Sequence, residues 1–303
     1  MAEAAEKKTA EATWKPTPEA KQRATRLRII AWILWIVAIV GEAVGIFWLL
    51  RQRQVAQSAA GTVVVTRDDA TGLLTQQSVT YEFPQWAFIA LIVLLVVIAA
   101  LSITGSVLWK RANRLDPASK QDKVRFFVQN QLGAIVAIVA FLPLIIMVFL
   151  NKDMSGGQKT LAGVVGIVLA GAAVALGIDF NPPSVEQYTA EQSTVVQLLG
   201  QDHVYWVAGG SVYHVCSEVS DIQNATTAPG EGTTAQAVEA GKSRLTLELQ
   251  SELKKCGLPV PENIDAIVDA IRQIQGGATD TVLPAPVYAA DVTPPFTPAV
   301  LGS

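Results

Sequence analysis

Both histidines and both cysteines of the chain fall in its C-terminal third, where they have the side chains to bind a metal ion. His203, His214 and Cys216 lie within HVYWVAGGSVYHVC, and Cys256 follows further along. If Gly209-Gly210 is the two-residue loop of a hairpin, the alternation of its strands puts His203, His214 and Cys216 on one face. Two imidazoles and two thiolates are a donor set that structural zinc favours, so these four residues are a candidate zinc site.

The cysteines have two other possible states. Cys216 and Cys256 form one disulfide if their domain is exported, and stay reduced, partly buried thiols if it lies in the cytoplasm. A Cys216–His214 nucleophile pair is the enzymatic alternative, but residues two apart on a strand do not reach hydrogen-bond distance and no orienting acid is evident. We therefore predict a protein that is not an enzyme.

Glu42 is the one ionisable residue well inside an apolar run, AWILWIVAIVGEAVGIFWLL. Such groups face protein or water rather than lipid and are functional candidates by default. A proton relay needs successive titratable groups, and the other apolar runs offer only Ser102, Thr104, Ser106 and Gln131. We therefore predict that the Glu42 carboxyl is protonated and hydrogen-bonded to a neighbouring helix.

Small residues accompany this carboxyl. Gly41 and Gly45 form a GxxxG pattern around it, and the fourth apolar run contains Gly163, Gly166 and Ala170. Small residues let helix backbones approach closely, which is the main way helices associate in lipid. The pattern favours helices that pack against protein.

Glu42 and the small residues lie in two of four apolar runs of the sequence. Each run has about the 20 residues needed to cross a bilayer. They lie near residues 29–50, 86–109, 131–150 and 160–178. The fold class is therefore a membrane all-α domain with four transmembrane helices, residues 29–180, followed by a small α+β domain, residues 181–280.

The two ends of the chain differ from these domains. Residues 1–28 are polar and lack an apolar period, which predicts a mostly disordered basic tail. Residues 281–303 hold five prolines and almost no charge, which predicts a flexible or extended tail that lies along a partner.

Charge asymmetry predicts the orientation of the helices. Residues 1–28 carry seven Lys and Arg and residues 110–129 carry six, whereas the first loop carries three and the third carries two. Positive charge marks the cytoplasmic side. We therefore expect a multi-pass protein of the plasma membrane with its N-terminus and its C-terminal domain in the cytoplasm, and an exported C-terminal domain as the alternative.

Within the α+β domain, the pattern predicts a β-hairpin and two helices. EQYTAEQSTVVQLLGQ reads as a short amphipathic helix that leads into the domain, and PENIDAIVDAIRQIQGG places five apolar residues on one helical face. GTTAQAVEAGKSRLTLELQSELKKCG reads as a helix that begins at a Thr233/Gln236 capping box, is kinked or divided at Gly241 and ends at Gly257. In the first loop, Thr62–Thr66 and Ser78–Phe83 predict a small hairpin.

Other classes of function find little support. The chain has no phosphate-binding glycine loop, haem-attachment motif or paired-carboxylate motif, so we expect no cofactor. It also has no basic face with interleaved aromatic residues, so we expect no nucleic-acid partner. Membrane lipid and other integral membrane proteins, in a hetero-oligomeric complex, are the partners that this composition favours.

The chain resembles a group of mostly uncharacterised four-helix membrane proteins of actinobacteria. The resemblance rests on the first apolar run, on LWKRANRLDPASKQDKVRFFVQNQLGAIVAIVAFLPLIIMVFLNKDMSGGQK, and on VYWVAGGSVYHVCSEVSDIQ with GTTAQAVEAGKSRL. The C-terminal domain of that group usually has more cysteines, so no metal or multi-bridge site is carried over.

Actinobacterial respiratory supercomplexes, which join a cytochrome bc-type complex to a terminal oxidase, carry accessory membrane subunits of this general build. The resemblance therefore implies an accessory or scaffold subunit of a larger membrane complex, with no role for individual residues. The alternative is a membrane sensor or transporter-like protein that uses Glu42 or the His/Cys face of its C-terminal domain.

Overall fold

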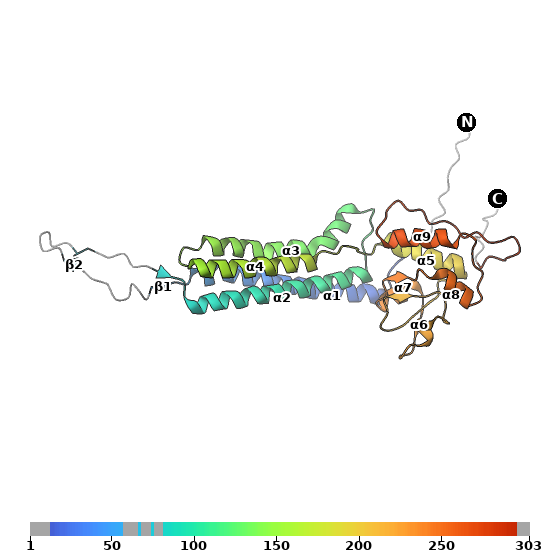
Figure 1. The fold of residues 1–303 in the computed structure, drawn as a ribbon, viewed down its shortest axis with the longest axis horizontal. Helices are drawn as coiled ribbons and strands as arrows, with labels where there is room; N and C mark the ends of the chain where they lie inside the picture. The colour runs from blue at the N-terminus through green and yellow to red at the C-terminus, as the bar shows by residue number, and fades with distance from the viewer. Residues whose placement is uncertain (1–12, 57–65, 68–73, 76–80, 296–303) are drawn as a thin grey trace, which may run out of the picture. The chain divides into compact units, whose positions relative to one another are not determined.

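The computed structural model describes residues 13–56, 66–67, 74–75 and 81–295 (Figure 1). The chain forms two compact units. The membrane unit comprises Arg28–Trp109 and Gln131–Ile178, and the α+β unit comprises Met1–Leu27, Lys110–Asn130 and Asp179–Ser303. The α+β unit is thus built from three separate segments of the chain, not only from its C-terminal part.

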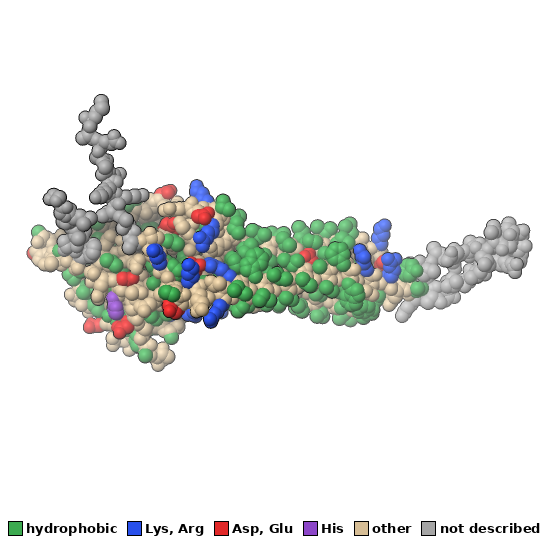
Figure 2. Space-filling view, turned by 180° about the vertical axis from the view of Figure 1, so that it is seen from behind, with side chains coloured by type: hydrophobic (Ala, Val, Ile, Leu, Met, Phe, Trp, Pro, Cys, Tyr) green, Lys and Arg blue, Asp and Glu red, His purple; other side chains and the backbone are tan. Residues whose placement is uncertain are grey.

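Among the described residues, four helices are long and apolar enough to cross a membrane, as the four apolar runs predict. They are α1 (Pro18–Phe47), α2 (Gln85–Leu115), α3 (Lys123–Leu150) and α4 (Gly156–Gly177). Figure 2 shows hydrophobic side chains along the sides of these helices and Lys and Arg side chains near their ends.

Helix α1 begins eleven residues before the predicted apolar run, so the prediction of a disordered tail for residues 1–28 is wrong over residues 18–28. Pro18 at the first helical position suits a helix start, and the following Ala, Lys, Gln and Arg residues have high helix propensity. Residues 1–12 lie outside the described part of the chain.

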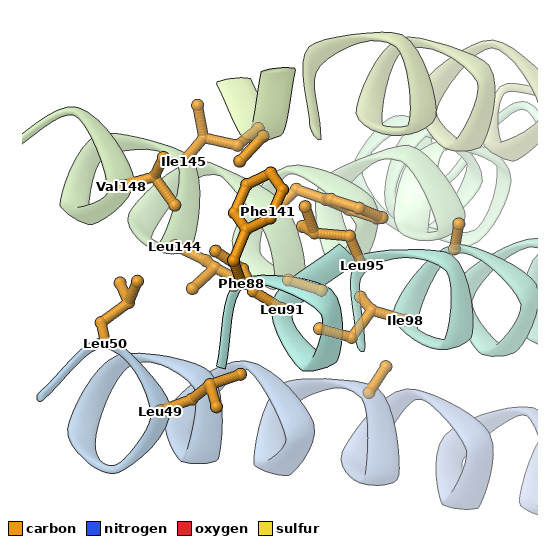
Figure 3. Packing of buried hydrophobic residues seen from close by; sticks show 14 of the residues in the cluster. Leu49, Leu50, Phe88, Leu91, Leu95, Ile98, Phe141, Leu144, Ile145 and Val148 are labelled. Carbon is orange, nitrogen blue, oxygen red and sulfur yellow. The ribbon is translucent and has the colours of Figure 1, made fainter. Parts of the chain in front are cut away.

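The core of the membrane unit packs α2 against α3. Figure 3 shows Phe141 of α3 near Leu95 of α2 and near Ile145 of α3. Leu49 and Leu50, which follow directly after α1, belong to the same cluster. Leu49 and Leu50 belong to a short 3-10 helix, η1 (Leu49–Arg51). Since these side chains are almost fully buried, they account for the mutual packing of the helices.

Short strands occupy the described parts of the first loop. Strand β1 (Gln54–Val55) pairs antiparallel with β4 (Tyr81–Glu82), and β2 (Thr66–Arg67) pairs antiparallel with β3 (Leu74–Thr75). The predicted strands Thr62–Thr66 and Ser78–Phe83 lie largely outside the described residues.

Between residues 179 and 295, the described part of the α+β unit contains five helices and four strands of two or three residues. The helices are α5 (Val185–Leu199), α6 (Ser220–Gln223), α7 (Thr234–Glu239), α8 (Leu249–Lys255) and α9 (Ile264–Gln275). The strands are β5 (Val204–Trp206), β6 (Val212–Tyr213), β7 (Gly230–Gly232) and β8 (Arg244–Leu245). Strand β5 pairs antiparallel with β7, and β6 pairs parallel with β8.

The hairpin predicted around Gly209-Gly210 is present only in part. Tyr205 and His214 form the antiparallel bridge that the prediction required, but the main partners of their strands lie elsewhere in the sequence. The reason is Lys242, whose Nζ donates hydrogen bonds to the carbonyls of residues 207, 208 and 210 at 2.5, 3.1 and 2.6 Å. These carbonyls turn toward the ammonium group, so the two-residue loop does not form.

The helix predicted across residues 232–257, kinked or divided at Gly241, forms two helices with a strand between them. Thr233 and Gln236 form the predicted capping box at the start of α7. Gly241 has φ +88°, a left-handed conformation that ends the helix, and β8 follows before α8 begins. Gly257, with φ +64°, lies just beyond the end of α8.

The α+β unit buries one apolar core between α5, α8, α9 and the strands. Helix α9 contributes the apolar face that its spacing predicts, with Ile264, Ile267 and Ile271 almost fully buried. The described part of the Pro-rich segment contacts this unit: Leu283 packs against the core, and the backbone N–H of Val287 donates to Asn263 Oδ1 at 2.8 Å.

Candidate functional site

The buried carboxyl of the membrane unit contacts a helix that contains a proline. Glu42 is 5% exposed, and its Oε1 accepts a hydrogen bond from the backbone N–H of Leu144 at 3.3 Å. Leu144 follows Pro143, which lies inside α3. Proline lacks an N–H and its ring clashes with the carbonyl one turn earlier, which weakens the hydrogen bonding of a helix around it. Glu42 therefore binds a backbone donor next to this proline.

The small residues singled out in the sequence contact other helices of the same chain. A Cβ at Gly45 would lie 2.9 Å from Leu94 of α2, and one at Gly166 would lie 2.9 Å from Ile145 of α3. Gly163 faces the ring of Phe149. The remaining two residues of the set, Gly41 and Ala170, pack against the same core.

Cys216 and Cys256 are joined in a disulfide, with their Cα atoms 5.9 Å apart. Of the three states that the sequence allows for them, the structure contains this one. Cys216 is fully buried, and Cys256 is half-buried beside it.

The zinc site proposed from His203, His214, Cys216 and Cys256 is not assembled. Sulfur atoms bonded to each other are not thiolate ligands, and His203 lies 3.6 Å from the carboxylate of Glu231. Over the described ranges, no group of three or more His, Cys, Asp or Glu side chains is placed to hold a metal ion.

His214 has an acidic partner that the sequence did not reveal. Its Nδ1 lies 2.8 Å from Oε1 of Glu252, and Oε2 of Glu252 accepts the backbone N–H of Val215 at 2.9 Å. Both side chains are at least nine-tenths buried. The spacing contains a signal for this contact: Glu252 precedes Cys256 by one helical turn, and His214 precedes Cys216 by two residues, so the disulfide brings the pair together.

A cavity of about 380 Å³ lies over this pair. His214, Glu252 and Thr246 form its buried floor, and exposed polar residues form its rim. The rim residues are Ser220, Asp221, Arg244 and Glu248. His214 Nε2 has no hydrogen-bond partner among the described residues. An imidazole oriented by a carboxylate through Nδ1 leaves Nε2 to bind a ligand or to exchange a proton.

A second buried carboxyl lies in the core of the same unit. Glu191 of α5 is fully buried and accepts four hydrogen bonds. Tyr213 Oη and Leu245 N donate to its Oε2, and Gln187 and Gln275 donate to its Oε1. Burial raises the pKa of Glu191 to about 7, although these donors act in the opposite direction. Burial and the adjacent Glu191 also raise the pKa of Tyr213, so this hydroxyl stays protonated.

Comparisons of the chain with protein-family models, with curated proteins and with solved structures found no match. The function must therefore be argued from the geometry of these groups.

Proposed function

We propose that this protein is a non-enzymatic, multi-pass membrane subunit that uses its α+β unit to dock on a larger membrane complex. The observation that carries the proposal is the construction of this unit from three separate chain segments. Segments that already pack within the unit do not have to become ordered when it docks, so docking costs less entropy.

The N-terminal segment is attached by specific contacts. The indole of Trp14 is buried with its centroid 4.7 Å from the ring of Tyr188, and its backbone N–H donates to Thr189 Oγ1 at 3.0 Å. Thr17 Oγ1 donates to a carboxylate oxygen of Glu239 at 2.7 Å. These contacts link residues far apart in the sequence, so the segment is part of the unit.

The segment between α2 and α3 is attached through Glu186 at the start of α5. The carboxylate of Glu186 accepts the hydroxyl of Ser119 and the backbone N–H of Lys120. Burial acts to raise the pKa of Glu186, but these hydrogen bonds outweigh it and the pKa is lowered. The backbone N–H of Val185 also donates to the carbonyl of Ala118 at 3.3 Å. The carboxylate therefore fastens this segment to α5 in its ionised form.

The partners that we propose are other integral membrane proteins in a hetero-oligomeric complex. The resemblance to actinobacterial membrane proteins suggests one complex in particular, the respiratory supercomplex of a cytochrome bc-type complex with a terminal oxidase. In this proposal the N-terminus and the α+β unit face the cytoplasm of the plasma membrane, because Lys and Arg concentrate in residues 1–28 and 110–129. The disulfide supports the exported side as the alternative.

Purification of the full chain from its native membrane in a mild detergent tests the docking role. We expect partner proteins in stoichiometric amounts with the wild type and with Glu231→Gln, which alters an exposed carboxylate. Glu186→Gln weakens the attachment of the Ser119–Lys120 segment and should reduce the yield of partners. A monodisperse monomer that retains every phenotype of the native protein would contradict the proposal.

The orientation is tested separately with a membrane-impermeant maleimide. Cys256 is half-buried and becomes reactive once the disulfide is reduced. We expect labelling only after cells are permeabilised and reduced. Labelling of intact cells after reduction from outside would place the α+β unit on the exported side and contradict the cytoplasmic assignment.

A membrane sensor or transporter-like protein is the second candidate. The contact between Glu42 and Leu144 N beside Pro143 favours it, because a change of charge on this carboxyl would change its hydrogen bond to α3 next to the proline. Glu42→Gln keeps an acceptor and removes the titration. Loss of a proton- or ion-dependent response with assembly intact would support this candidate, whereas weaker helix association alone would support the subunit.

A further inference from the structure

We propose that the cavity over His214 and Glu252 binds a small organic cation with a primary ammonium group. This binding site is separate from the docking role and does not depend on it. The proposal rests on the buried acceptor at the floor of the cavity, on the charges at its rim and on its size.

The floor of the cavity presents a hydrogen-bond acceptor. Val215 N–H donates to one oxygen of Glu252, and His214 Nδ1 lies 2.8 Å from the other oxygen. The binding mode that we propose uses the tautomer of His214 with its proton on Nδ1, in which Nε2 offers a lone pair to the cavity. The side chain is nine-tenths buried, so a ligand that donates to Nε2 lies at the bottom of the cavity.

The rim of the cavity carries an excess of negative charge. Asp221 and Glu248 are two exposed carboxylates, and Arg244 is the single guanidinium facing them. An ammonium group has three N–H donors and one positive charge. It can donate to His214 Nε2 while its charge is attracted by the excess negative charge of the rim, whereas a neutral alcohol lacks this charge and an anion carries the opposite one.

The size and the construction of the cavity suit a small molecule. A volume of about 380 Å³ lies in the range of small-molecule sites. Val212, Val219 and Leu247 also line it and offer apolar contacts to a short carbon chain. The disulfide cross-links the segment that follows His214 to the end of α8, which carries Glu252, so the floor is held in place before a ligand binds.

The test is calorimetric titration of the purified full chain in detergent with 1,4-diaminobutane hydrochloride. The matched probes are 1,4-butanediol, which has the same carbon chain and no charge, and inorganic phosphate, which has the opposite charge. We expect saturable binding of the diamine and no binding of the diol or of phosphate. Equal binding of diamine and diol, or binding of phosphate in place of the diamine, would overturn the proposal.

Rim variants localise the binding without disturbing buried contacts. Asp221→Asn and Glu248→Gln should each weaken diamine binding about threefold, as expected for one exposed charge pair. Glu231→Gln is the matched control, because Glu231 is an exposed carboxylate of the same unit that does not line this cavity, and it should bind the diamine as the wild type does. Unchanged affinity in the Asp221→Asn/Glu248→Gln double variant would refute the assignment of the site.

Discussion

Glu191→Gln should abolish a pH dependence of the stability of the α+β unit. Glu191 is fully buried, and its pKa is raised from 4.5 to about 7 by burial. Between pH 4.5 and about pH 7, the folded chain holds a proton on this carboxyl, whereas the unfolded chain has released it. Stability therefore falls as pH rises, since the unfolded state binds fewer protons in this range.

The size of the effect follows from the shift. A rise from 4.5 to about 7 corresponds to about 3 kcal/mol of unfolding free energy. This stabilisation is fully present below pH 4.5 and is lost as pH rises through the folded pKa. Tyr213, which donates to the same carboxyl, has a raised pKa and stays protonated throughout, so it adds no pH dependence.

Pulse proteolysis of the full chain in urea measures this quantity, because the α+β unit can be followed by its own cleavage products. From pH 5 to pH 8 the wild type should lose about 1 M or more in its urea midpoint, for a slope of about 1 to 3 kcal/mol per M. Glu191→Gln should show a midpoint that changes little with pH, and the exposed-site control Glu231→Gln should behave as the wild type. A wild-type midpoint that rises over this range, or the same fall in Glu191→Gln, would refute the reasoning.

Three further perturbations test packing, the disulfide and the contacts of a loop. Gly177→Ala would place a Cβ 2.6 Å from the backbone nitrogen of Ala134 in α3 and should destabilise the helix bundle by about 1 to 3 kcal/mol, whereas Gly171→Ala, with nothing within 4 Å, should not; thermal unfolding in detergent compares the two. Reduction of the disulfide, or the Cys216→Ser/Cys256→Ser double variant, opens a loop of sequence separation 40. Either change should lower the unfolding free energy of the α+β unit by about 4 kcal/mol, measured from its urea midpoint. Lys242→Ala removes the donor to three carbonyls and should cost about 3 kcal/mol in the same assay, with faster amide exchange in residues 207–211. No change in any one of these measurements would contradict the corresponding contact.

The sequence predicts best where one element carries its own signal. Four apolar runs, each long enough to cross a membrane, predict α1 to α4. Apolar residues at helical spacing between residues 264 and 274 predict α9. The sequence predicts poorly where the partner is distant. Strand β8 interrupts a segment of helical pattern because it pairs with β6, and no local feature of residues 244–245 indicates this.

The candidate site shows the same division. Composition and spacing single out His214 and Cys216, and the disulfide was among the states considered for the cysteines. Glu252 was missed because its role depends on a cross-link that joins two distant segments, although its position one turn before Cys256 contains that information. The apolar surroundings of Glu42 in the sequence indicate a buried carboxyl. They do not indicate its hydrogen-bond donor, because Leu144 N becomes the partner of Glu42 only when α1 packs beside this part of α3.

Because its strands are short, the α+β unit uses buried ionisable side chains to satisfy backbone hydrogen-bonding groups. Strands of two or three residues leave many backbone N–H and C=O groups without a strand partner, and such groups are costly to bury unpaired. Glu191 accepts the N–H of Leu245, Glu252 accepts the N–H of Val215, and Lys242 donates to three loop carbonyls. Each of these side chains thus replaces part of a missing β-ladder. His214 Nε2 differs, since among the described residues it satisfies no backbone group, and for that reason we assign it to a ligand, not to the fold.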